Sequence, residues 1–292
     1  MEKISNQKLE IGVKEHGAEL CSIIRKSDGR EYMWQASPEY WKRHSPVLFP
    51  IVGSLWNKEM RQDGKTYTMG QHGFARDMDF ELIEKSADTL RYRLTSSEET
   101  KRLYPYDFIL EIGYKLADNK VTVEWKVKNP SEQEIHFQIG AHPAFNYMNY
   151  NPEAETIGYF KFDKEDDTYT LSLVGEKGCL KEERAQLATD KGILPINRHS
   201  FDNDAIILEN DQVHSVTLLD ADKKAYLTLR YEAPVIGLWS PARDGYAPFV
   251  CIEPWYGRCD RENYTGEYSQ KDWMQHLAPG KEFDVKYSIE IL

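Results

Sequence analysis

Apolar and polar residues alternate along much of the chain, whereas long apolar stripes at helical spacing are missing. Between Val121 and Val127 every second residue is apolar, and Thr122, Glu124 and Lys126 lie between them. Successive side chains of a strand point to opposite faces, so this pattern predicts a half-buried antiparallel strand. The same reasoning predicts further strands at 90–94, 108–116, 215–220, 225–232 and 283–292.

Two Asp-Gly dipeptides punctuate the strand pattern. Asp28-Gly29 separates CSIIRK from REYMW, and Asp63-Gly64 precedes KTYTM. This dipeptide tolerates the positive φ of a tight hairpin turn. We therefore expect a β-hairpin at each position.

Helices are expected to be few and short. The segment SSEETKRLY carries a capping-box spacing from Ser96 to Glu99, but Pro105 ends it within about two turns. The acidic stretch at 161–169 is interpreted as a solvated hairpin tip, because strand-like aromatic residues flank it.

No fixed-period repeat and no Gly/Ser-rich or Pro-rich linker divides the chain. We therefore predict one domain over residues 1–292. So many strands in one domain must bury two faces, which predicts a large, mostly antiparallel all-β sandwich with a concave face free for a ligand.

Composition narrows the range of partners. The 292 residues carry a formal net charge of −11, which repels nucleic acid and anionic lipid. The first residues are polar and unlike a secretory leader, and no apolar stretch reaches the ~18 residues of a membrane helix. The cysteines show no metal-ligand spacing, so we expect four free thiols and a cytoplasmic protein: Cys21, Cys179, Cys251 and Cys259.

Three polar residues lie in apolar or glycine-rich surroundings. His142 in FQIGAHPAFN and Glu253 in APFVCIEPWYG each directly precede a proline, which favours an extended backbone, and we place both at strand ends. A carboxylate in such an apolar run is costly unless it is paired or used, with bonding to backbone amides or to Arg258 as the structural alternative. His72 in GQHGFARD lies beside a glycine, and a histidine in such a turn is, taken alone, more often structural than functional.

Four motifs place these residues in a familiar order. Together they resemble the aldose 1-epimerase family, closest to its LacX-like branch, and the resemblance extends from GAEL at 17–20 to HLAPGKEF at 276–283. The motifs are HGFAR at 72–76, GAHPAFN at 140–146, FDNDAIIL at 201–208 and CIEPWYG at 251–257.

The resemblance implies a galactose mutarotase-like β-supersandwich with a few short helices and a sugar on its open face. It also implies roles for individual residues. His142 corresponds to the general acid, Glu253 to the general base and His72 to a second histidine of the site. The family's sugar-binding aspartate falls on Asp204, or on Asp202 if the alignment slips.

Some positions depart from the family pattern. Many members carry a sugar-gripping arginine in the segment that matches FPIVGSLWNKE, where this chain has Ser54 and Lys58. Lysine lacks the planar fork of arginine, so Arg76 is the candidate substitute unless it only pairs with Asp77 or Asp79 at the surface.

Two tryptophans flank the glutamate strand. Trp239 or Trp255 offers a flat apolar face to a sugar, and core packing is the alternative for either.

Anomer interconversion requires opening of the hemiacetal ring, for which one base and one acid suffice. A carboxylate serves as the base and a protonated histidine as the acid. No metal, nucleotide or redox cofactor takes part in this chemistry, and the chain carries no phosphate-binding glycine loop, HExxH or CxxC spacing. The expected partner is therefore a small sugar alone, and the sequence does not indicate an oligomeric state.

Four other functions remain open from the sequence. The protein could bind sugar without turnover, or it could act on hexose 6-phosphates through the basic cluster Lys42–His44. The two histidines with Glu253 would also suit a metal enzyme. A glycosidase could use Glu253 with Asp204 but would leave both histidines without a role.

Overall fold

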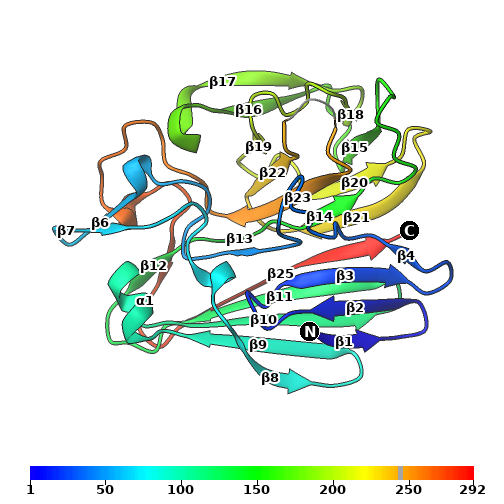
Figure 1. The fold of residues 1–292 in the computed structure, drawn as a ribbon. Helices are drawn as coiled ribbons and strands as arrows, with labels where there is room; N and C mark the ends of the chain where they lie inside the picture. Colours follow the sequence, from blue (N-terminus) through cyan, green and yellow to red (C-terminus); the bar gives the residue numbers. More distant parts are fainter. Residues whose placement is uncertain (243–245) are drawn as a thin grey trace.

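The computed structural model describes residues 1–242 and 246–292, and antiparallel β-sheet dominates this part of the chain (Figure 1). The one α-helix described there is α1 (Glu98–Leu103). Short 3-10 helices lie at η1 (Trp56–Lys58), η2 (Ala75–Asp77), η3 (Glu176–Gly178) and η4 (Tyr268–Gln270). The prediction of a mostly antiparallel all-β protein with few short helices is confirmed.

All six strands predicted from alternation lie in one nine-stranded sheet. Its strands follow the order β18 (Ile193–Ile196), β15 (Gly158–Phe162), β20 (Ser215–Leu219), β21 (Ala225–Tyr231), β25 (Glu282–Ile291), β11 (Lys120–Lys128), β10 (Ile109–Ala117), β9 (Thr89–Thr95) and β8 (Glu81–Lys85). In β11 the apolar residues from Val121 to Val127 are buried and the residues between them are partly exposed. One face of this sheet therefore packs on the core, as the alternation predicts.

A second large sheet contains strands with almost no exposed side chains. In β22 and β23 nearly every residue is buried, which is why their sequences are continuous apolar runs. The strand order is β17 (Leu180–Ala188), β16 (Thr168–Val174), β19 (Ile206–Leu208), β22 (Val235–Trp239), β23 (Phe249–Tyr256), β13 (Ile139–Ala141) and β5 (Val47–Leu48), and β14 (Ala144–Asn146) also pairs with β23.

Three smaller sheets complete the fold. The N-terminal sheet, blue in Figure 1, packs near β10, where the Tyr114 hydroxyl donates a hydrogen bond to the Ala18 carbonyl at 2.7 Å. The N-terminal sheet consists of β1 (Glu2–Ser5), β2 (Leu9–Val13), β3 (Leu20–Arg25) and β4 (Arg30–Glu31). The other two sheets have two strands each: β6 (Glu59–Gln62) with β7 (Lys65–Thr68), and β12 (Ile135–Phe137) with β24 (Gln275–Leu277).

The sheets share buried side chains. The largest apolar cluster contains residues from Ile4 in β1 to Ile291 in β25. All four cysteines are buried free thiols. No helix in the described residues is long and apolar enough to cross a membrane.

Both predicted Asp-Gly hairpins form. Asp63 and Gly64 have φ of 52° and 71° between β6 and β7, which are the positive values that a two-residue turn requires. Gly29 has φ of 68° between β3 and β4.

Two local predictions were wrong. Helix α1 is capped by Ser97 with Thr100, not by Ser96 with Glu99, because the Ser96 hydroxyl donates to Asp107 instead. The acidic stretch 161–169 is solvated, but it is not a hairpin tip. It connects β15 in the nine-stranded sheet to β16 in the other sheet, and these two strands pair with different partners.

Candidate active site

The candidate site forms where one strand beside β23 is broken. β14 pairs with β23 at Cys251, and β13 pairs with it again at Trp255. Between them the chain departs from the ladder at His142-Pro143, which faces the part of β23 that holds Glu253. The break brings a histidine and a carboxyl group together.

The same break explains a proline inside β23. Pro254 has no N–H to donate, and on this side of β23 the neighbouring strand is interrupted. The prediction that Glu253 lies at a strand end was therefore wrong, because it lies in the interior of β23. His142 directly follows β13, as expected.

The two side chains are in contact and almost fully buried. His142 Nε2 lies 3.2 Å from Glu253 Oε2, and the residues are 7% and 1% exposed. The His142 ring stacks on Trp41 at 4.7 Å between centroids and meets Trp239 edge-on at 5.6 Å. Two aromatic side chains therefore fix the orientation of the imidazole.

His72 is held by its backbone and by one hydrogen bond. Its φ is 66°, and Gly73 has φ of 72° with no room for a Cβ, which would lie 2.2 Å from the Phe49 carbonyl oxygen. The Gly53 N–H donates to His72 Nδ1 at 3.0 Å, so a neutral His72 carries its proton on Nε2. The ring lies edge-on to His142, 5.5 Å away.

These residues line a cavity of about 300 Å³, at the small end of the range for small-molecule sites. Trp41, Trp239 and Trp255 supply apolar walls. The charged and polar lining groups are His72, His142, Glu253, Gln71, Arg76 and Asp204. Such a mixture of flat apolar faces and hydrogen-bonding groups suits a ring that carries both C–H bonds and hydroxyls.

Of the two candidate aspartates, only Asp204 lines this cavity. Asp204 has φ of 71°, and its Oδ1 accepts from the Ala205 N–H at 2.7 Å. Asp202 lies outside the lining and contacts His199 Nδ1 at 2.7 Å.

Arg76 also lines the cavity, and its ion pair with Asp77 is long. It donates to the Gln71 carbonyl at 2.8 Å, while its Nε is 3.8 Å from Asp77 and makes no hydrogen bond within the described residues. Lys58 is exposed, and neither it nor Ser54 lines the cavity.

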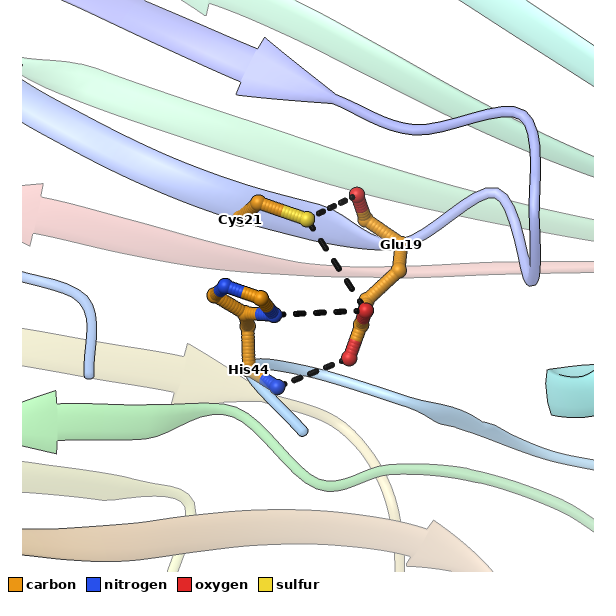
Figure 2. A group of neighbouring side chains, drawn as sticks. All are labelled: Glu19, Cys21 and His44. Carbon is orange, nitrogen blue, oxygen red and sulfur yellow. Dashed lines mark hydrogen bonds and ion pairs between the residues drawn. The ribbon is translucent and has the colours of Figure 1, made fainter. Parts of the chain in front are cut away.

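The basic cluster at 42–44 does not form a pocket for phosphate. Arg43 is paired with Asp77 at 2.8 Å, and His44 is buried. Glu19 fixes this segment. Its Oε1 accepts from the His44 N–H at 2.8 Å, which Figure 2 shows, and also from the Ser45 N–H at 3.1 Å. Glu19 thereby fixes the loop that presents Trp41.

The protonation of the buried pair differs from the sequence-based expectation of a carboxylate and a histidinium. Burial raises the pKa of Glu253 well above its ordinary value, and the Asp204 carboxylate adds to the effect. Burial lowers the pKa of His142 to about 3, and the cations Arg76 and Arg43 act in the same direction. Burial disfavours the charged form of each group, so this structure favours a neutral carboxyl beside a neutral imidazole.

His72 is also neutral here. Burial lowers its pKa well below the ordinary histidine value, and His142, Arg76 and Arg43 add to the effect. The site therefore contains two neutral imidazoles at neutral pH.

The metal-ligand set suggested by the sequence, His72 and His142 with Glu253, does not converge on one point in the structure. The donor atoms that cluster within 4.8 Å are those of His142, Cys251 and Glu253, without His72. Glu19, Cys21 and His44 form a second cluster of potential ligands (Figure 2). Its carboxylate already accepts hydrogen bonds from backbone amides.

Sequence reasoning missed Trp41 and Gln71. Both lie in loops, where neither periodicity nor a motif marks a residue as part of a site. The signal that existed for Trp41 is a large aromatic residue within the polar segment PEYWKRH.

Comparisons with known proteins identify the family of this chain. Residues 3–290 match the aldose 1-epimerase family. The chain is 32% identical over 298 residues to the chromosomal LacX protein of Lactococcus lactis subsp. lactis, with 99% of each chain covered.

Solved structures give the same result. A galactose mutarotase related enzyme from Lactobacillus acidophilus is 35% identical with a TM-score of 0.92, covering 100% of this chain and 97% of that one. A galactose mutarotase-like protein from Lactobacillus casei is 28% identical with a TM-score of 0.93 over the whole of both chains. The predicted galactose mutarotase-like fold and the LacX resemblance are confirmed, and the chain belongs to the aldose 1-epimerase family.

Proposed function

We propose that this protein is an aldose 1-epimerase that interconverts the α and β anomers of a hexose. The observation that carries the proposal is the 3.2 Å contact between His142 Nε2 and Glu253 Oε2 within a cavity walled by tryptophans. A protein that only binds sugar needs neither a proton donor nor a proton acceptor in this place.

The chemistry balances with these two groups alone. The Glu253 carboxylate removes the proton of the C1 hydroxyl, and the His142 imidazolium gives its proton to the ring oxygen. The bond between C1 and the ring oxygen breaks with its electron pair on the ring oxygen, and C1 becomes an aldehyde. Rotation about C1–C2 and the reverse transfers close the ring on the other face.

Burial favours the products of this proton transfer. Ring opening converts carboxylate and imidazolium into carboxyl and neutral imidazole, which is the form that the buried pair prefers. The neutral and ionic forms of the pair hold the same number of protons. Transfer of the Glu253 proton to His142 across their 3.2 Å contact therefore gives the reactive ionic form without proton exchange with solvent. The His72 Nε2–H and the indole rings then hold the sugar in place.

The charges of the cavity favour a neutral hexose over a hexose 6-phosphate. Arg76 is the one cation among the lining residues that the structure describes, and the Asp204 carboxylate offsets its charge. We propose that Asp204 and Arg76 bind hydroxyl groups of the sugar. A phosphate would meet no cluster of cations there.

Polarimetry of freshly dissolved α-galactose and α-glucose tests the proposal. We expect the purified protein to accelerate mutarotation of at least one of them and to act more weakly on the 6-phosphates. Sugar binding without any acceleration would show a non-catalytic protein, and a preference for the 6-phosphates would overturn the assignment to neutral hexoses.

The pH dependence of kcat/KM should show the unusual protonation of the pair. The active form of the His142–Glu253 pair holds one proton in total. The pair gains a second proton only when His142 is protonated while Glu253 is also protonated, and it loses its one proton when Glu253 ionises beside a neutral His142. Because the pKa of His142 lies at about 3 and that of Glu253 is raised, kcat/KM should stay flat as the pH falls through 6.5 and decline only far below it. An acid limb with its half-maximal rate near pH 6.5, the value of an ordinary histidine, would contradict this assignment.

Trp41 should contribute to turnover through its contact with the His142 ring. We expect Trp41→Leu to lower kcat by about two- to tenfold, the equivalent of one lost aromatic contact, with Trp41→Phe closer to wild type. Steady-state mutarotation kinetics and thermal unfolding of both variants measure this. Equal kcat in all three proteins would exclude a role in positioning His142.

A further inference from the structure

A third group of potential metal ligands lies outside the cavity, on the strand pair formed by β12 and β24. His136 and His276 are directly opposite each other in this antiparallel pair, so their side chains lie on the same face. Glu134 precedes His136 by two residues, which places it on that face as well. The alternate residues Ile135 and Leu277 are buried, which anchors both strands.

The three side chains converge on one point. His136 Nδ1 and His276 Nδ1 lie 3.9 and 3.7 Å from Glu134 Oε2, and the three donor atoms all lie within 4.8 Å of one another. These separations are too long for hydrogen bonds. They are close to the ~3.3–3.6 Å between two ligands of one tetrahedral zinc ion, given metal–ligand distances of about 2.0–2.2 Å.

The ligand atoms have no competing partners. Across residues 1–242 and 246–292, none of the three side chains makes a hydrogen bond, and the buried Nδ1 of His136 is left unsatisfied. This differs from Glu19, whose carboxylate is engaged by backbone amides. Orphaned buried nitrogens are uncommon and call for a water molecule or an ion.

The exposure of the group also suits a metal. The side chains of Glu134 and His276 are 51% and 49% exposed, which leaves room for water to complete the coordination.

We propose that Glu134, His136 and His276 form a binding site for a divalent transition-metal ion of the zinc class. Two imidazoles and a carboxylate with open positions are a donor set for such ions, whereas Mg²⁺ and Ca²⁺ prefer oxygen ligands. A bound ion would join β12 to β24, two segments that lie far apart in the sequence. Because β12 runs into β13 and then to His142, the ion would stabilise the strand that presents this histidine.

Titration of the tag-free protein with Zn²⁺, followed by calorimetry, tests the proposal. We expect one saturable equivalent in the wild type, together with a rise in the unfolding temperature on addition of Zn²⁺. Removal of a group that only orients a ligand costs about 10–100-fold in affinity, so Glu134→Gln and His276→Gln should each lose at least that much. Both side chains are exposed, so these variants should fold.

His199→Gln is the matched control, since His199 is also an exposed histidine beside an acidic side chain. It should bind Zn²⁺ as the wild type does. The proposal is overturned if the wild type binds no Zn²⁺, if both test variants bind it with unchanged affinity, or if the control loses binding equally. Unchanged binding in the test variants would place the ion away from β12 and β24, at a different donor group such as that at His142 or that at His44.

Discussion

Glu253→Gln is expected to lower kcat/KM for mutarotation by about 10²–10⁴-fold, the contribution of one general base. The amide has nearly the same shape as the carboxyl group but cannot accept the proton of the C1 hydroxyl. The folded protein should lose no stability, because burial already favours the neutral form of Glu253 and a neutral amide removes no preferred charge. We therefore expect loss of turnover with an unchanged or raised unfolding temperature.

Glu209→Gln provides the contrasting control. Glu209 directly follows β19 in the second large sheet and is also buried. Unlike Glu253, its carboxylate accepts a hydrogen bond from Arg258 Nε at 2.8 Å. Burial raises its pKa, yet Arg258 and several hydrogen bonds outweigh this and hold the pKa below the ordinary value. This variant should be less stable because it removes one of the two carboxylate partners of the buried Arg258 and leaves only Asp272. If Glu253→Gln turned over at the wild-type rate, Glu253 would have no part in the mechanism.

His142→Asn is expected to lower kcat by about 10²–10⁴-fold and to change sugar affinity much less. A donor to the ring oxygen acts mainly in the transition state, so its loss appears in turnover. His72→Asn should have a milder effect that is divided between kcat and KM, since His72 only approaches His142 edge-on.

Kinetics and sugar binding of the two histidine variants measure this difference. A much larger loss in His72→Asn than in His142→Asn would exchange the roles of the two histidines. Weaker sugar binding with an unchanged kcat in His142→Asn would indicate a role in binding alone.

Local chemistry made much of the fold predictable. The alternation in β11 identified its buried face, and the Asp63-Gly64 turn required positive φ values that the structure contains. The identity of a strand's partners is not local information, however. The stretch 161–169 therefore looked like a hairpin tip, although it links two different sheets.

The site was predictable only where motifs mark it. His72, His142 and Glu253 were identified from their contexts, and the structure gathers them around one cavity. Their protonation was not predictable, because it depends on burial that the sequence does not reveal. Trp41 was missed because its role arises from a loop that Glu19 fixes from another part of the chain.

Two-dimensional exchange NMR on a hexose at anomeric equilibrium tests the central proposal most directly. It measures the rate at which the α and β C1 protons exchange, and any other reaction would produce new signals. With chelator present, we predict faster exchange between the two anomeric signals with wild-type protein, none above background with Glu253→Gln, and no new product. Exchange at the background rate with saturating wild-type protein for galactose, glucose and their 6-phosphates would contradict the assignment of an epimerase.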